Sequence, residues 1–204
     1  MRIGYNTSTK FCAKFVNHAL IEKKNDKGKY DDVVSSFVEF DPDNESDSDT
    51  LREVQYYWQD KGLFADNICF DAFAISKDVL DRDKYKIFIL TTQNENYENL
   101  DDKKIIGLVE FLNNEEDRNS INYIQINPDN IYVLNKPMYN HIGKAMIDSL
   151  KYNYSDKPIV LNSTKSAKKF YEKNDFKRIN NIPIQYEWRP DNPDNNSNSL
   201  VLFG

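Results

Sequence analysis

The sequence predicts one α/β (α+β) domain, built from alternating strands and helices and preceded by an extra N-terminal helix. The chain has 204 residues, 39% of them hydrophobic and 13% aromatic, which suits one domain with a packed core. Apolar residues recur at helical spacing in some segments and form short β-branched runs in others. We expect the domain to cover residues 1–190, with residues 1–28 as a helical extension and residues 191–204 as a polar tail.

The first half of the chain is predicted to hold helices around one strand. Residues 8–23 place apolar side chains four apart, as an amphipathic helix does. Residues 33–40 are rich in Val and Phe and favour a strand. The acidic residues 41–49 are expected to form a loop. A Thr-x-x-Glu capping box then opens a helix over residues 50–62, and another helix is expected over residues 68–80.

The second half is predicted to run strand, strand, strand, helix, strand, helix, strand, strand. Apolar residues at helical spacing mark the helix at residues 142–150. Ser163 or Thr164 is expected to cap the second helix, with Tyr171 facing inward. The apolar residues 200–203 either dock onto the domain or contact a partner. The predicted strands cover residues 86–92, 105–112, 121–126, 158–161, 176–179 and 183–188.

Composition argues against several classes of function. The net charge of −6 disfavours general binding to nucleic acid or to anionic membranes and modestly favours a cationic substrate. No apolar run approaches the roughly 20 residues that span a bilayer, and the N-terminus lacks a signal-peptide core, so a cytoplasmic protein is expected. Cys12 and Cys69 are expected to be reduced core thiols. With only two histidines, far apart, no metal site is expected.

Two motifs carry the most specific signal. The first is Asn140-His141-Ile142-Gly143-Lys144-Ala145 at the start of a predicted helix. The second, residues 167–176, reads A-K-K-F-Y-E-K-N-D-F. In order and spacing they resemble the acyl-CoA-binding core of the GCN5-related N-acetyltransferase (GNAT) superfamily, a Q/R-x-x-G-x-G/A turn followed by an A-x-x-[LF]-Y-E-K-x-G-F helix. The order of elements over residues 33–190 is also similar, which implies a mixed, mostly antiparallel sheet of about six or seven strands with helices on both faces.

The resemblance implies acetyl-CoA (coenzyme A) as co-substrate. In the family, the strand matching residues 121–126 splays from its parallel neighbour, and its main chain pairs with pantetheine; here Ile124, Gln125 and Ile126 would make those contacts. A helix start suits the pyrophosphate because its N–H groups are unpaired and lie at the positive end of the helix dipole. Thr164 stands where the family often has a cofactor-binding Asn. The residues expected at the pyrophosphate are Asn140, His141, Ile142, Gly143, Lys144 and Ala145.

The chain departs from the family pattern in three places. Asn140 replaces the usual Gln or Arg. Residues 128–140 form a longer segment than usual, which we expect to shape the acceptor pocket. Asp175 replaces the usual Gly, and Asp tolerates the left-handed conformation that ends a helix.

The resemblance assigns the chemistry to a few side chains. Tyr171 matches the tyrosine that protonates or hydrogen-bonds the leaving thiolate; otherwise it is a core aromatic. Glu110 is the candidate general base, with a water chain or a solvated strand residue as the alternatives. Among residues 50–80, Tyr56, Tyr57 and Phe64 are candidates for the acceptor pocket, whereas Trp58 is expected in the core.

The implied activity is direct transfer of an acetyl group from acetyl-CoA to an amine, on a small molecule or a protein, in a ternary complex. Two alternatives stay open. One is a weak or inactive binding module on the same fold, which senses coenzyme A or binds a protein. The other is a toxin-like acetyltransferase acting on aminoacyl-tRNA, which the net charge disfavours. The identity of the amine and a homodimeric state also stay open.

Overall fold

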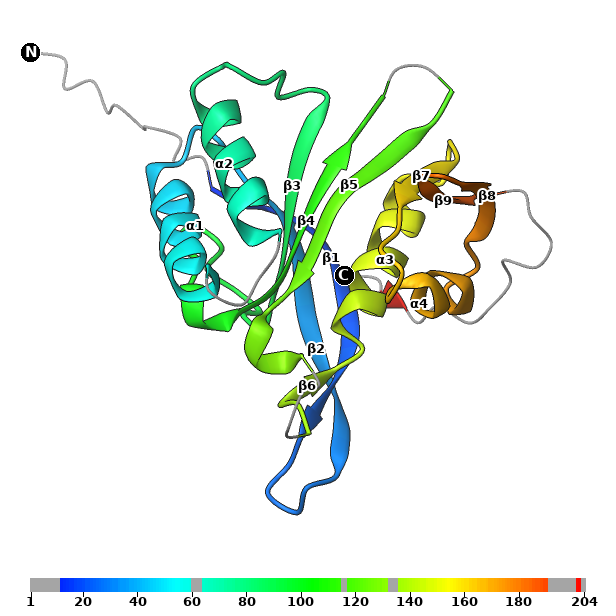
Figure 1. The fold of residues 1–204 in the computed structure, drawn as a ribbon. Coiled ribbons are helices and arrows are strands. Elements are labelled where there is room, and N and C mark those ends of the chain that lie inside the picture. Colours follow the sequence, from blue (N-terminus) through cyan, green and yellow to red (C-terminus); the bar gives the residue numbers. More distant parts are fainter. Residues whose placement is uncertain (1–11, 60–63, 115–116, 132–135, 191–200, 203–204) are drawn as a thin grey trace, which may run out of the picture.

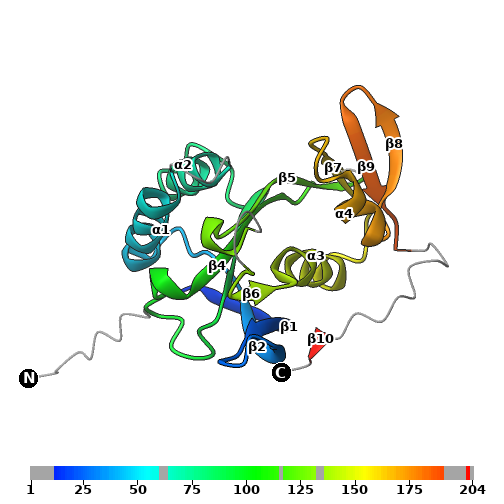
Figure 2. The ribbon, with the colours of Figure 1, turned by 60° about the horizontal axis from the view of Figure 1, so that its bottom comes forward.

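The computed structural model describes residues 12–59, 64–114, 117–131, 136–190 and 201–202. Across these residues the strands form one sheet of ten strands, in the order β10-β1-β2-β3-β4-β5-β7-β9-β8, with β6 also paired to β1. Helices α1 and α2 cover one face and α3 and α4 the other (Figures 1 and 2). The mixed α/β class and the helices on both faces are confirmed, but the sheet is larger than the six or seven strands expected.

The expected N-terminal helix is wrong where the structure describes it. Lys14–Lys24 form strand β1, paired antiparallel with β2 (Tyr30–Glu39). Side chains four apart lie on one face of a helix, but also on one face of a strand, because four is a multiple of the strand period of two. The chain turns back after Lys24, where the Asn25 side chain accepts the N–H groups of Lys27 and Lys29 at 3.0 Å each. This turn lets the segment pair with β2 as a strand. Residues 8–11 of the expected helix lie outside the described residues.

The loop expected at residues 41–49 is also wrong in its second half. Helix α1 runs over Glu45–Trp58, and the Asn44 side chain caps it by accepting the Ser46 N–H at 3.1 Å. Acidic residues in the first turn favour this earlier start through the helix dipole. Thr50, expected to cap the helix, lies inside it and donates to the Ser46 carbonyl at 2.9 Å. Helix α2 follows at Ala65–Ser76.

The remaining elements agree with the predictions to within a few residues. One exception is helix α4, Lys168–Lys173, whose N-cap residue is Ala167 rather than Ser163 or Thr164. Two short 3-10 helices, Asp102–Lys104 and Pro128–Asn130, join strands. The agreeing elements are β3 (Tyr85–Thr91), β4 (Ile105–Leu112), β5 (Asn119–Ile126), α3 (Ile142–Asn153), β7 (Ile159–Asn162), β8 (Lys177–Asn181) and β9 (Ile184–Trp188).

Two short strands extend the outer edge of β1. Strand β10, Val201–Leu202, pairs antiparallel with β1 opposite Ala19 and His18. Strand β6, Tyr139–Asn140, pairs further along the same edge. Of the two alternatives for the apolar C-terminus, docking onto the domain is therefore the one found for Val201 and Leu202.

The core consists of two apolar clusters, one on each face of the sheet. The cluster under α1 and α2 includes Trp58, as expected, and Cys69. Burial raises the pKa of the Cys69 thiol to about 12, whereas Cys12 is only partly buried. The other cluster joins α3 and α4 to the sheet and includes Tyr171. Within the described residues, no helix is long and apolar enough to cross a bilayer, and no three His, Cys, Asp or Glu side chains gather as metal ligands.

Candidate active site

Strands β5 and β7 are paired only over the first three residues of β5. The parallel pairing joins residues 119–121 to residues 159–161 and stops there. Strand β5 continues to Ile126, paired with β4 on its other side, while β7 diverges from it (Figure 1). Within the described residues, the β5 edge beyond Ile121 has no strand beside it. An extended ligand chain can pair with such an edge as an added strand does.

A cavity of about 950 Å³ opens at this divergence. Its wall is formed by β5, the start of α3, the β7–α4 connection, α4 and residues just before α2 and α3. Ala145 does not line it, because its side chain is buried in the core. Every other residue expected to bind the cofactor does: Ile124, Gln125, Ile126, Asn140, His141, Ile142, Gly143, Lys144, Thr164 and Tyr171.

Helix α3 points its N-terminus at the cavity. His141, the residue before the helix, has a left-handed backbone with φ of 64°, uncommon for a residue other than glycine. The first helical hydrogen bond runs from the Ala145 N–H to the His141 carbonyl at 2.9 Å. The N–H groups of residues 142–144 precede that bond, and none of them has an acceptor within the described structure. The first turn holds no acidic side chain, so this end of the cavity suits an anion.

Gly143 is needed for a reason that its motif does not reveal. A Cβ atom at this position would lie 3.0 Å from Cζ of Phe170 and 3.3 Å from its Cε2. The ring of Phe170 thus packs directly on the backbone of the first turn of α3. A side chain here would displace that ring, which itself lines the cavity.

Tyr171 lies in α4 between the core and the cavity. Its side chain is 6% exposed, and its ring centroid is 5.8 Å from that of Phe176 and 6.0 Å from that of Tyr186. Burial raises the pKa of Tyr171 to about 12, so the hydroxyl keeps its proton at neutral pH. No hydrogen bond to this hydroxyl is formed within the described residues, which leaves it able to donate to a ligand.

The turn after Tyr171 is held by Lys151, a residue that the motifs do not include. The Lys151 ammonium donates to the Asn174 carbonyl at 2.5 Å and lies 3.5 Å from the Asp175 carboxylate. Asp175 has φ of 61°, the left-handed conformation that Asp tolerates in place of the family's Gly. No sequence signal marks this contact, because it joins residues 23 and 24 apart.

Glu110 lies behind the cavity wall rather than in it. Its side chain is 1% exposed, and Asn122, which does line the cavity, donates to Oε1 at 2.8 Å. Oε2 has no donor among the described residues, because its neighbour in α2 is another carboxyl, Asp71. Burial and the Asp71 carboxyl raise the pKa of Glu110 to about 7, although the Asn122 bond lowers it.

The other predicted residues divide into two groups. Phe64 lines the cavity and stacks on Tyr123 with ring centroids 5.5 Å apart, whereas Tyr56 and Tyr57 are exposed and lie outside the wall. The segment at residues 128–140 contributes to the wall, as expected; its residues 132–135 lie outside the described structure.

Two predicted side chains at the cavity make contacts that the motifs do not indicate, and a third side chain was not predicted at all. Asn140 donates to Glu22 at 3.2 Å, so its amide is partly engaged away from the cavity. Thr164 lies 3.1 Å from the Ser166 hydroxyl. Asn162 also lines the wall, close in sequence to the Thr164 position, but only the fold shows that it faces the cavity.

No protein-family model matches the sequence, and no curated protein matches it. Solved structures do match in fold. An acetyltransferase from Thermus thermophilus superposes with a TM-score of 0.53 at 12% identity, covering 76% of this chain and 96% of that one. A protein described as a GNAT-family acetyltransferase from Desulfovibrio desulfuricans superposes with a TM-score of 0.51 at 11% identity, covering 76% and 99%. The chain therefore has the fold of the GCN5-related N-acetyltransferase superfamily, as its two motifs predicted.

Proposed function

We propose that the protein is an N-acetyltransferase that uses acetyl-CoA and an amine. One observation carries the proposal: a single cavity joins the unpaired edge of β5, the open N-terminus of α3 and the free hydroxyl of Tyr171. These are the three features that a thioester cofactor with a pyrophosphate group needs. The sequence motifs, found independently of the cavity, fall on its wall.

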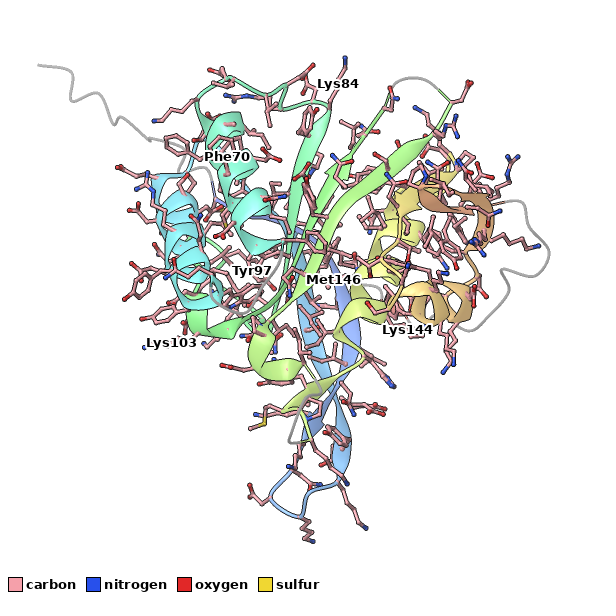
Figure 3. The ribbon with its side chains drawn as sticks, viewed as in Figure 1. Phe70, Lys84, Tyr97, Lys103, Lys144 and Met146 are labelled. Atoms are coloured by element: carbon pink, nitrogen blue, oxygen red, sulfur yellow. The ribbon has the colours of Figure 1, made fainter. Side chains whose placement is uncertain are left out.

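The cofactor has a natural orientation in this cavity. Its pantetheine arm would pair with the main chain of Ile124 and Ile126 on the open edge of β5. Its pyrophosphate would accept the N–H groups at the start of α3. The Lys173 side chain adds positive charge to the same side of the wall, and the Lys144 side chain, at this helix start (Figure 3), is paired with Asp148.

In the proposed reaction, Tyr171 and Glu110 each take part in one of the two proton transfers. Acetyl-CoA supplies a thioester carbon that an amine can attack. Tyr171 holds a proton that it can donate to the sulfur as the carbon–sulfur bond breaks. Glu110, with its pKa near neutral, accepts the proton that the amine loses. Because Asn122 separates Glu110 from the cavity, this transfer needs a bridging water.

A binding module on the same fold is the second candidate. The observation that favours it is the position of Glu110, which does not touch the cavity. Such a protein would bind coenzyme A but would not consume the thioester when an amine is supplied.

The test combines binding and turnover. Acetyl-CoA is titrated calorimetrically into the wild type, Gly143→Trp and, as a control, Val79→Trp, whose side chain is 74% exposed and outside the cavity. We expect binding by the wild type and the control, and loss of binding in Gly143→Trp because the indole meets Phe170. Thiol release with an amine panel then separates the enzyme from the module. No binding by the wild type would refute both candidates.

A further inference from the structure

We propose that the acceptor is a primary amine on an aromatic or branched aliphatic group, with no second positive charge. This inference rests on the acetyltransferase function proposed above. It concerns the end of the cavity that lies away from α3. The two ends differ in chemistry, and the difference selects the acceptor.

The cavity reaches both faces of the sheet. Ile124 and Ile126 belong to the apolar cluster under α3 and α4, whereas Tyr123 packs against the cluster under α1 and α2. All three line the same cavity. The cavity therefore passes through the divergence between β5 and β7, and an acceptor can approach from the α2 side while the cofactor occupies the α3 side.

The acceptor end is apolar and aromatic. Its wall holds Phe64, stacked on Tyr123, and the same cavity is also lined by Ile131 and Pro137. Its polar side chains include Gln125 and Asn122, whose amide groups already donate to the Ile126 carbonyl and to Glu110, each at 2.8 Å.

The described wall contains no Asp or Glu. Its charged side chains are Lys144 and Lys173, and both lie on the α3–α4 side. Although the chain has a net charge of −6, none of its carboxylates lines the described wall, so a polyamine or an aminoglycoside would find no direct counter-ion there. Each additional ammonium of such a substrate would enter apolar surroundings without a counter-ion, which is costly.

A single amine, in contrast, has a carboxyl group that can take up its proton. The Glu110 carboxyl lies one hydrogen bond behind the wall, since it accepts from Asn122 at 2.8 Å, and it lies on the α2 side beside Asp71. The apolar surroundings also lower the pKa of a bound ammonium, because burial disfavours the charged form. A single amine on an apolar group thus loses its proton more readily here than in water, and the neutral amine is the nucleophile.

The experiment compares 2-phenylethylamine and isoamylamine with spermidine and kanamycin. The readouts are thiol release from acetyl-CoA and, independent of turnover, calorimetric binding of each amine to the protein loaded with coenzyme A. We expect kcat/KM for 2-phenylethylamine to exceed that for spermidine by about tenfold or more, with measurable binding only for the two apolar amines.

Two variants test the wall itself. Phe64→Asp places a carboxylate at the acceptor end, and the change suits the fold because residue 64 is the uncapped N-cap of α2. Ile131→Asp places a carboxylate at another position on the same wall, at a residue that is 39% exposed. Each should lower kcat/KM for 2-phenylethylamine about tenfold and raise it for spermidine. Ile179→Asp, on the exposed strand β8, is the control and should change neither value.

The outcomes separate this inference from the function on which it rests. Equal or better use of spermidine or kanamycin by the wild type would overturn the inference and leave the acetyltransferase standing. Failure of 2-phenylethylamine to bind the loaded protein would overturn it as well. Failure of acetyl-CoA to bind at all would refute the proposed function and, with it, the inference.

Discussion

Replacing Glu110 by Gln should make the protein more stable at alkaline pH. The wild-type carboxyl is buried, receives one hydrogen bond from Asn122 and faces the Asp71 carboxyl. Gln keeps the oxygen that Asn122 contacts and places an amide N–H toward Asp71. The substitution thus removes a buried charge and supplies the donor that Oε2 lacks.

The sign and the size of this stability difference follow from the raised pKa of Glu110. The pKa in the folded protein, about 7, exceeds the ordinary value of 4.5. The folded protein therefore binds more protons than the unfolded chain between these values, and the stability falls as the pH rises through this window. At about 1.4 kcal/mol per pKa unit, the full loss is on the order of 3 kcal/mol, most of it between about pH 5 and pH 8.

The assay is urea unfolding of both proteins across this pH range. The difference in unfolding free energy should move in favour of Glu110→Gln by about 2 to 3 kcal/mol and then level off. Burial also raises the pKa of Asp47 to about 7, but Asp47 is common to both proteins and cancels. Glu53→Gln, on the exposed face of α1, is the matched control. A difference that does not change with pH would refute the account of Glu110.

Three further predictions concern the proposed reaction. Tyr171→Phe should lower kcat about a hundredfold or more with little change in calorimetric acetyl-CoA affinity; an unchanged kcat would remove Tyr171 from the chemistry. Asp71→Asn removes a carboxyl that raises the pKa of Glu110, so the midpoint of the kcat/KM–pH profile should move to lower pH, and a fixed midpoint would exclude Glu110 as the base. Lys151→Met removes the donor to the Asn174 carbonyl. Urea unfolding should show that the free energy of unfolding falls by roughly 1.5–3 kcal/mol, and an unchanged value would contradict the stabilising role of Lys151 in this turn.

Local signals predicted the half of the chain that forms the site. The strand at residues 121–126, the helix from Ile142 and the position of Tyr171 were all predicted from nearby residues. Asp175 tolerates the left-handed conformation, and the structure shows that it adopts it. These features depend on short-range rules of capping, periodicity and turn conformation, which a single sequence contains.

The N-terminal half shows where such rules fail. The apolar spacing in residues 8–23 fits both a helix and a strand, and pairing with β2 decides in favour of the strand. The capping box at Thr50 is a valid signal for a helix start, but the helix begins earlier, after the N-cap residue Asn44. In both places the sequence offers two local solutions, and the contacts that select one, the pairing with β2 and the Asn44 cap, are seen only in the structure.

The sequence by itself determined the elements around the cavity and the residue types that line it. Only the tertiary structure decided how they meet: Phe170 on Gly143, Lys151 on Asn174, and Glu110 behind Asn122. It also decided that the described wall of the cavity carries no acidic side chain, although the chain as a whole is acidic. The physical reason is that side-chain packing and burial depend on neighbours in space, and no short-range pattern records which distant residues become neighbours.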